Sequence, residues 1–214
     1  MRDEVRADAL LASLEEEHKG KLKVFLGAAP GVGKTYAMLQ AVREQAKEGV
    51  DILIGVVETH GRQETLALLD KLAIQPRKLH HHRQQRLEEM DLDGLLERKP
   101  AIVVVDELAH TNAPGSRHEK RWQDVEELLG AGIDVYSTLN VQHLESLNDL
   151  VWQLTGVRVK ETLPDQVLLE ADSIVLIDLP PKELLGRLKE GKVYVPHQAK
   201  SALRPFFSLN NLTA

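Results

Sequence analysis

Two groups of residues in this sequence have the types and the spacing needed to bind a nucleoside triphosphate together with Mg²⁺. The first group closes the segment GAAPGVGKT with Gly33-Lys34-Thr35. Glycines allow the positive φ angles that turn backbone N–H groups inward as a cradle for phosphate. We expect Lys34 to reach the β- and γ-phosphates and the Thr35 hydroxyl to ligate Mg²⁺. The predicted nucleotide-binding residues are Pro30, Gly31, Val32, Gly33, Lys34, Thr35, Tyr36 and Asp106.

This segment departs from the usual phosphate-loop pattern at one position. Ala28 stands where G-x-x-x-x-G-K-[ST] has its first glycine, and Gly27 precedes it. Alanine fits there if the backbone keeps an ordinary φ. The apolar run at 22–26 and the helical spacing of apolar residues at 38–46 supply the strand and the helix that the motif requires on either side. The alternative is a glycine-rich turn that carries a surface lysine.

The second group is an acidic pair that follows the most apolar stretch of the chain. Residues 101–105 read AIVVV, which predicts a buried strand, and Asp106 and Glu107 come directly after it. We expect Asp106 to hold Mg²⁺ through water, because Mg²⁺ keeps part of its hydration shell. Glu107 is the candidate general base, placed to polarise an attacking water. The alternative is that the pair caps a helix after the strand.

Other polar residues are candidates for contacts with the γ-phosphate. The loop 108–118 follows the acidic pair and carries Arg117, and the next helix carries Arg121. Either could stabilise γ-phosphate charge as an arginine finger, although an exposed surface arginine is the alternative. Thr138 and Asn140 end a further predicted strand and are candidate γ-phosphate sensors. Asn140 would otherwise cap the following helix.

Two clusters of polar residues have less specific interpretations. Glu58, Thr59 and His60 follow the predicted strand 51–57, so they could form a second wall of the site or a structural loop. The run His80–His82 suggests metal binding, but consecutive side chains point in different directions on any regular element. A solvated or partner-facing strand end explains these histidines better.

The elements that position these residues alternate between strand and helix. Main strands are predicted at 22–26, 51–57, 101–105, 133–139 and 173–179, and helices include 62–74 and 87–98. This order predicts an α/β, P-loop NTPase-like fold with a mostly parallel sheet of about five to seven strands and helices on both faces. We expect one domain over 1–214. It would begin with an amphipathic helix within 1–20 and end in a helix at 199–214 that leads to further domains.

Composition limits the other classes of function. The 214-residue chain is 43% hydrophobic and 28% charged, as expected for one domain with a full core. Its net charge of −6 and 4% aromatic content argue against direct nucleic-acid binding. It has no cysteine, which fits a cytosolic setting. No apolar run approaches the ~18 residues of a membrane span, so we expect a soluble chain, or the soluble piece of a larger membrane protein, without direct membrane insertion.

Several longer stretches are more specific than either motif. They read GKLKVFLGAAPGVGKTYAML, VVETHGR and VDELAHTNAPGSRHEKRWQDVEELLGAGIDVYSTLNVQHLESLND, with a further region up to KVYVP. Through them, nearly the whole chain resembles the N-terminal cytoplasmic domain of the KdpD family, the bacterial sensor histidine kinases of potassium homeostasis. The resemblance implies an ATP-binding regulatory domain. In the family this domain precedes a universal-stress-protein-like segment, a membrane domain and the histidine-kinase core.

The resemblance also implies a location and partners. The domain would lie on the cytoplasmic side of a bacterial inner-membrane protein, and its partner would be the remainder of the same sensor kinase. A response regulator would be reached only through the kinase core, and a homodimer is left open. The chain has no phosphoacceptor helix and no glycine-box ATP lid, so His-to-Asp phosphotransfer is not assigned to it.

Three functions therefore compete. The first is a regulatory ATP–Mg²⁺ module in which nucleotide occupancy biases the 108–118 loop and so modulates the attached kinase or phosphatase. The second is a catalytic P-loop ATPase or a phosphotransferase that acts on a protein or small-molecule acceptor. The third is a nucleotide-free interaction scaffold, which leaves the phosphate loop and Asp106 without a purpose.

Overall fold

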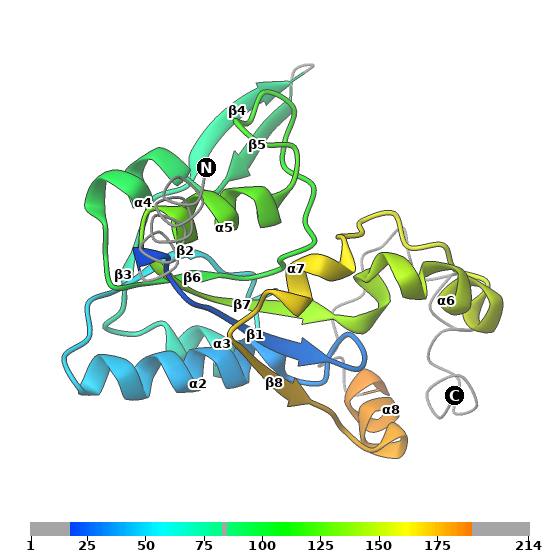
Figure 1. Cartoon of the computed structure of the whole chain (residues 1–214). Helices are drawn as coiled ribbons and strands as arrows, with labels where there is room; N and C mark the ends of the chain where they lie inside the picture. Colours follow the sequence, from blue (N-terminus) through cyan, green and yellow to red (C-terminus); the bar gives the residue numbers. More distant parts are fainter. Residues whose placement is uncertain (1–17, 83–84, 190–214) are drawn as a thin grey trace, which may run out of the picture.

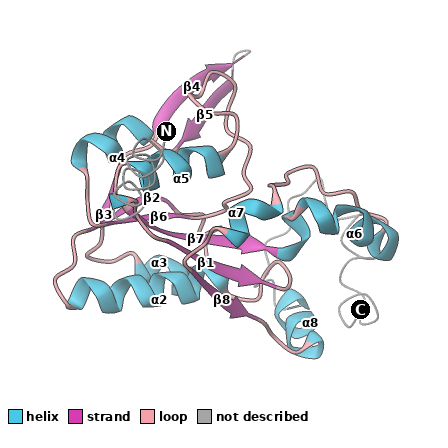
Figure 2. Cartoon of the chain, in the orientation of Figure 1, coloured by secondary structure: helices cyan, strands magenta, loops and turns pink. Residues whose placement is uncertain are grey.

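The computed structural model describes residues 18–82 and 85–189, and its centre is a six-stranded, all-parallel β-sheet (Figures 1 and 2). The strand order is β3-β2-β6-β7-β1-β8, and a separate antiparallel hairpin pairs β4 with β5. The strands are β1 (Leu22–Gly27), β2 (Ile52–Val56), β3 (Ala73–Ile74), β4 (Lys78–His82), β5 (Gln85–Glu89), β6 (Ile102–Val105), β7 (Asp134–Asn140) and β8 (Ser173–Ile177). The helices are α2 (Lys34–Lys47), α3 (Gln63–Leu68), α4 (Leu92–Arg98), α5 (Arg121–Gly130), α6 (Asn148–Thr155), α7 (Asp165–Leu169) and α8 (Pro181–Lys189), with 3₁₀ turns η1 (Val141–His143) and η2 (Glu145–Leu147). The predicted α/β class and mostly parallel sheet are confirmed.

Helices cover both faces of the sheet. In Figure 1, α2 and α3 lie below it and α4 and α5 lie above it. Helix α2 buries Met38 and Leu39 against one face, and α5 buries Val125 and Leu128 against the other. All four residues of β6 are buried, because this central strand is covered on both sides. The continuous apolar run at 101–105 is therefore explained by its place in the sheet.

The strand order brings three loops to one edge of the sheet. Strand β7 lies between β1, which precedes the glycine-rich loop, and β6, which precedes the acidic pair. The register places Gly27 beside Asn140 and Val105 beside Ser137. Parallel strands end at the same edge, so the residues that follow β1, β6 and β7 face one another across a single site.

The helix predicted at 87–98 is wrong in its first part. Gln85–Glu89 form β5, and α4 begins only at Leu92. Strand β5 pairs with β4, and the register sets Leu87 opposite His80. Local apolar spacing did not reveal this partner strand. The resulting hairpin stands above α5 in Figure 1 and carries His80–His82 on β4.

The helix predicted at 62–74 is also too long. Helix α3 ends at Leu68, and Lys71 takes a left-handed φ of 66°, which a helix does not tolerate. Ala73 and Ile74 then pair with β2 as the short edge strand β3. The terminal helices predicted at 1–20 and 199–214 fall outside the described residues, apart from 18–20.

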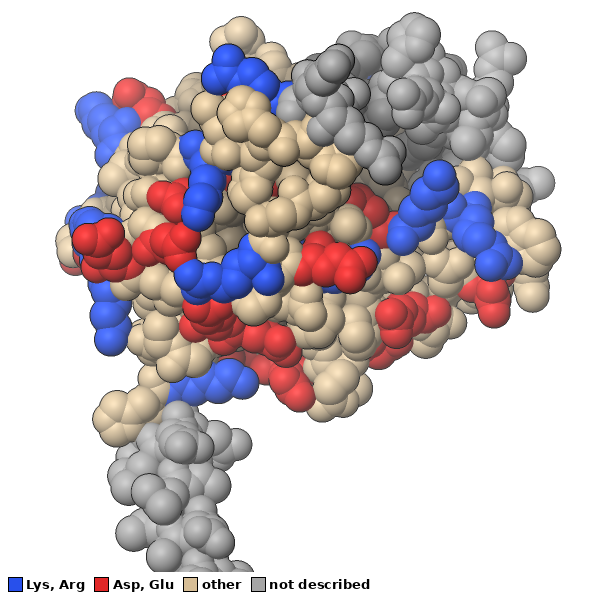
Figure 3. All heavy atoms as spheres, turned by 90° about the horizontal axis from the view of Figure 1, so that it is seen from above, with Lys and Arg blue, Asp and Glu red and all other residues tan. Residues whose placement is uncertain are grey.

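No helix in the described part of the chain has both the length and the apolar character needed to cross a bilayer. On the face seen in Figure 3, Lys and Arg side chains are interspersed with Asp and Glu side chains. Mixed charge of this kind gives no strong net field over that face.

Candidate functional site

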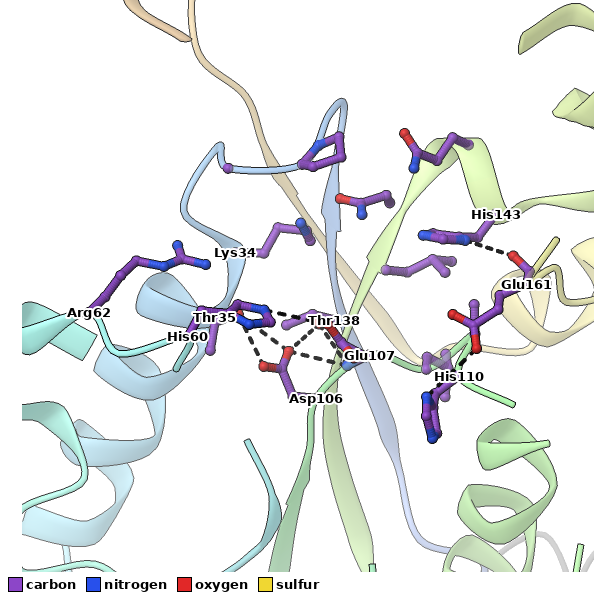
Figure 4. Close-up of a pocket in the computed structure, with 17 residues that line it drawn as sticks. Lys34, Thr35, His60, Arg62, Asp106, Glu107, His110, Thr138, His143 and Glu161 are labelled. Atoms are coloured by element: carbon purple, nitrogen blue, oxygen red, sulfur yellow. Dashed lines mark hydrogen bonds and ion pairs between the residues drawn. The ribbon is translucent and has the colours of Figure 1, made fainter. Parts of the chain in front are cut away.

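A pocket of about 270 Å³ opens where β1, β6 and β7 end (Figure 4). It is lined by Pro30, Gly31, Lys34, Thr35, His60, Arg62, Asp106, Glu107, Leu108, Ala109, His110, Thr138, Leu139, Asn140, Gln142, His143 and Glu161. The pocket therefore unites most of the residues predicted from the glycine-rich loop with the acidic pair and with Asn140. Residues from the turn after β2 and from the segment after α6 complete its walls.

The glycine-rich loop has glycine where its course requires one. Gly31 and Gly33 take φ angles of 86° and 104°, where a side chain would strain the backbone. Gly27 is needed for another reason: a Cβ at this position would lie 2.4 Å from Cδ of Lys34. The stem of Lys34 thus passes directly over Gly27. The residue without a Cβ that Lys34 needs beside it is therefore Gly27, and not the residue at position 28. Ala28 in place of the usual first glycine is compatible with this loop.

Three predicted binding residues, Val32, Gly33 and Tyr36, do not line the pocket. The Val32 side chain is buried in a small apolar cluster with Leu184 of α8, which holds the loop from behind. Tyr36 is 39% exposed and its hydroxyl accepts a hydrogen bond from Gln40. A role for these three residues in phosphate binding would rest on their backbone N–H groups.

Lys34 lies in surroundings that disfavour its charge. Burial is the main cause, and it lowers the pKa of Lys34 to about 8. The carboxylates of Asp106 and Glu107 oppose this shift, and the guanidinium of Arg62 adds to it. An anionic ligand would restore the favourable environment that the ammonium lacks.

Asp106 is the most highly constrained carboxylate of the site. It is 1% exposed and lies 3.2 Å from Oγ1 of Thr35. The Thr138 hydroxyl donates to its Oδ1, and the backbone N–H groups of Glu58 and Glu107 donate to its carboxylate oxygens at 3.1 and 3.2 Å. Thr138, a candidate γ-phosphate sensor, is 2% exposed, and the hydrogen bond that its hydroxyl donates orients Asp106.

These residues fit the way Mg²⁺ is bound with nucleotides. The Thr35 hydroxyl and the Asp106 carboxylate lie side by side across the pocket floor. The described residues contain no cluster of three or more His, Asp or Glu side chains that would cage a metal alone. Mg²⁺ at nucleotide sites takes one or two protein oxygens and completes its shell with water and phosphate. Thr35 and Asp106 match that donor set.

Glu107 is held in an unusual backbone conformation beside Asp106. Its φ is 57°, a left-handed value that is uncommon for a residue with a side chain. Burial in the pocket, followed by the charges of Asp106 and Glu58, raises the pKa of Glu107 to about 7, against the opposing charges of Arg121 and His110. Its side chain is 46% exposed, and Oε1 lies 3.8 Å from Nε2 of His60. Glu107 can therefore exchange a proton near neutral pH.

The end of β7 carries polar atoms that lack a partner. Oδ1 of Asn140 and Oε1 of Gln142 are buried without a hydrogen bond in the described part of the chain. Asn140 precedes η1, but its side chain makes no capping bond, so the alternative role as a helix cap is wrong. Buried unsatisfied polar groups are rare and costly in folded proteins. Both atoms are acceptors, so a ligand would satisfy them with a donor group, or with an acceptor group once the amides rotate to present NH₂.

The structure separates the two arginines that were considered for a finger role. Arg117 does not line the pocket and forms ion pairs with Asp93 and Glu127. Arg121 is 3% exposed and lies behind the pocket, where its guanidinium donates to the carbonyl of Asp106 at 2.9 Å and contacts Glu89. Arg121 thus supports the backbone of the acidic pair.

Four titratable lining residues were missed by sequence reasoning, Arg62, His110, His143 and Glu161, and so was the amide of Gln142. Nδ1 of His143 lies 2.7 Å from the carbonyl oxygen of Glu161. A carbonyl only accepts, so Nδ1 carries the proton and Nε2 has the lone pair. Burial lowers the pKa of His143 against the opposing Glu161 carbonyl. These residues come from several separate segments, and their only sequence signal was membership of the stretches that carry the family resemblance.

Comparison with known proteins gives consistent matches. A family model described as "KdpD: Osmosensitive K+ channel His kinase sensor domain" matches residues 18–214. The chain is 56% identical to Sensor protein KdpD of Escherichia coli K12 over 207 residues, which cover 97% of this chain and 23% of that protein. Sensor protein KdpD of Clostridium acetobutylicum is 52% identical over 96% of this chain, and that of Mycobacterium tuberculosis is 49% identical over 92%, each over 23% of the relative. The chain therefore spans about a quarter of the length of these relatives.

Proposed function

The chain belongs to the KdpD sensor-domain family, and we propose that it is the ATP–Mg²⁺-binding regulatory domain of a two-component sensor histidine kinase that controls potassium-transport genes. The proposal rests above all on one observation: a half-buried lysine lies in the same pocket as a paired threonine hydroxyl and aspartate. Its partner would be the remainder of the kinase, and its location the cytoplasmic side of the inner membrane. Nucleotide occupancy would modulate the kinase or phosphatase output.

Each residue has a role in this proposal. The backbone N–H of Gly31, which follows Pro30 in the loop, and the ammonium of Lys34 bind the phosphates, whose charge stabilises the protonated lysine. Thr35 and Asp106 hold Mg²⁺, which neutralises charge on the β- and γ-phosphates. The amide of Asn140 can offer its NH₂ group to the γ-phosphate, because rotation of the amide exchanges its oxygen and nitrogen.

A second function, slow ATP hydrolysis, is favoured by Glu107. Its pKa of about 7 leaves a substantial fraction ionised at neutral pH, and its carboxylate lines the same pocket as Lys34. An ionised Glu107 can accept a proton from a water that attacks the γ-phosphate. The domain would then reset itself by consuming its ligand.

Calorimetric titration of the chain with ATP in the presence of Mg²⁺ tests the proposal. Lys34→Ala should weaken ATP binding about 100-fold or more, because a charge-assisted contact to phosphate contributes about 3 kcal/mol. Lys47→Ala is the matched control, since Lys47 lies on the same helix but pairs with Glu44 at the surface. Equal ATP affinity in wild type and Lys34→Ala would contradict the phosphate-loop assignment.

Phosphate release from the same sample separates the two functions. Tight binding with negligible release supports a regulatory module. Sustained release that Glu107→Gln removes, without loss of ATP affinity, assigns the general base. If release persists in Glu107→Gln, another group activates the water.

A further inference from the structure

The turn that follows β2 directs an arginine at the phosphate loop. Arg62 lines the pocket together with Lys34 and immediately precedes α3. Figure 4 shows its side chain extending from the β2 side toward the loop that carries Lys34. The turn is closed by a hydrogen bond from the Arg62 N–H to the carbonyl of Thr59 at 3.0 Å. It contains two left-handed residues, His60 (φ 50°) and Gly61 (φ 73°), and this conformation is uncommon for His60, which carries a side chain.

The guanidinium of Arg62 lacks the anion that a half-buried arginine normally has. Its Nε is buried without a hydrogen-bond partner in the described part of the chain. The neighbouring acids are engaged elsewhere: Glu58 pairs with Arg77 at 2.8 Å, and Glu107 lies 3.8 Å from His60. Guanidinium groups in protein interiors are normally matched with carboxylate or phosphate.

Arg62 and Lys34 are also close enough for their like charges to interact. Two cations in one partly buried pocket repel each other unless an anion lies between them. A carboxylate from the chain could have played this role, but Asp106 is already committed to four hydrogen-bond donors. Asp106 and Glu107 line the same pocket and offset part of this charge, but the guanidinium of Arg62 forms no ion pair in the described part of the chain.

We propose that Arg62 is a second phosphate-binding residue, which contacts the terminal phosphate of a nucleoside triphosphate and makes the site prefer a triphosphate to a diphosphate. This inference rests on the proposed nucleotide site. Strand β2 pairs with β6, and Asp106 directly follows β6. Arg62 thus approaches from the side of the acidic pair, where the γ-phosphate and its Mg²⁺ lie in P-loop sites. Lys34, which follows the loop after β1, would contact the β-phosphate as well as the γ-phosphate, so it would still hold a diphosphate.

Calorimetry with Mg²⁺-ATP and Mg²⁺-ADP on wild type, Arg62→Gln and Arg62→Lys tests this assignment. We expect Arg62→Gln to weaken ATP binding about 10- to 100-fold and to leave ADP binding within about 3-fold, because the lost contact is a charge-assisted one to the γ-phosphate alone. Arg62→Lys should recover part of the ATP affinity, since it keeps the charge without the planar fork. Arg158→Gln is the control, because Arg158 is a surface arginine on the segment after α6.

The outcomes distinguish this inference from the proposed function. Suppose that wild type binds both nucleotides. If Arg62→Gln then weakens ATP and ADP binding by the same factor, or changes the affinity for neither nucleotide, the γ-phosphate role of Arg62 is refuted and the nucleotide site stands. If wild type binds neither nucleotide, both proposals fail. Retained ADP binding by Arg62→Gln also shows that the variant is folded, so a selective loss of ATP affinity reports the contact itself.

Discussion

Replacing Thr138 with valine removes one hydroxyl from beneath the acidic pair and keeps the shape of the side chain. Thr138 is 2% exposed, so no water replaces the lost group without rearrangement. Its Oγ1 donates to Oδ1 of Asp106 and accepts the N–H of Glu107 at 3.1 Å. The substitution therefore removes a donor to a buried carboxylate and an acceptor for a backbone amide.

The two lost hydrogen bonds contribute different amounts to the free energy of unfolding. A hydrogen bond to a charged group contributes about 1.5–3 kcal/mol, and a neutral one about 1 kcal/mol. The N–H of Glu107 also lies 3.2 Å from Oδ1 of Asp106, so it keeps an acceptor in the variant. The cost is then mainly the bond to Asp106, and we expect Thr138→Val to lower the free energy of unfolding by about 2 kcal/mol.

Binding should respond as well, because a less fixed Asp106 is a poorer Mg²⁺ ligand. Mg²⁺ should raise the ATP affinity of Thr138→Val about 5- to 10-fold less than it raises that of wild type, a difference of about 1 kcal/mol. The affinity for ATP without Mg²⁺ should change little. Urea unfolding and calorimetry with and without Mg²⁺ measure the two effects. Thr138→Ser is the control. It should retain most of the wild-type free energy of unfolding and most of the Mg²⁺-dependent gain in ATP affinity, since it keeps the hydroxyl. If Thr138→Val unfolds like wild type and keeps its full Mg²⁺ response, Thr138 does not orient Asp106.

Two further changes test other parts of the site. Between pH of about 4.5 and 7 the folded chain binds more protons at Glu107 than the unfolded chain does, because its folded pKa is raised, so stability falls as pH rises through that window. Glu107→Gln should therefore raise the melting temperature of the Mg²⁺-free chain near pH 8 and not near pH 4.5; equal shifts at both pH values would contradict the raised pKa. Leu184→Ala should lower the free energy of unfolding by about 2 kcal/mol, because Leu184 is 2% exposed and packs against the phosphate loop. It should also increase hydrogen exchange of the Val32 amide. Unchanged exchange at Val32 would show that α8 does not hold the loop.

The local parts of the site could be predicted from sequence. The strand, loop and helix around Lys34 are adjacent in the chain, and the glycines that the loop needs are visible as residue types. The pairing of Thr35 with Asp106 spans 71 positions, yet it followed from two motifs whose chemistry requires a shared metal. For these residues, residue type and spacing were sufficient to predict that they lie in one pocket.

Prediction failed where a distant partner decides the outcome. Arg117 and Arg121 are equally plausible beside the acidic pair, but α5 begins at Arg121 and turns it toward the interior. Glu89, on the hairpin strand that was predicted as part of a helix, supplies the carboxylate that pairs with the buried Arg121, in addition to the carbonyl of Asp106. The error at 87–89 and the ambiguity between the arginines therefore have the same origin, a pairing that sequence spacing does not display.

This pairing also bears on how nucleotide occupancy would be transmitted. Glu89 is 7% exposed and accepts from Arg121, from His110 and from the N–H of Ala113 at 2.8 Å. Burial alone would raise the pKa of Glu89, but the hydrogen bond and charge of His110 and the charge of Arg121 outweigh it and hold the pKa low.

The 108–118 loop is thus fastened to the hairpin through a buried carboxylate. Its far end is closed by a hydrogen bond between the Asn112 N–H and the carbonyl of Glu119. A loop tied in this way does not open like a lid on free hinges. Arg121 joins the backbone carbonyl of Asp106 to Glu89, so the acidic pair is linked to the β4–β5 hairpin as well as to the loop. A nucleotide that shifts the backbone at Asp106 would therefore act on the hairpin together with the 108–118 loop.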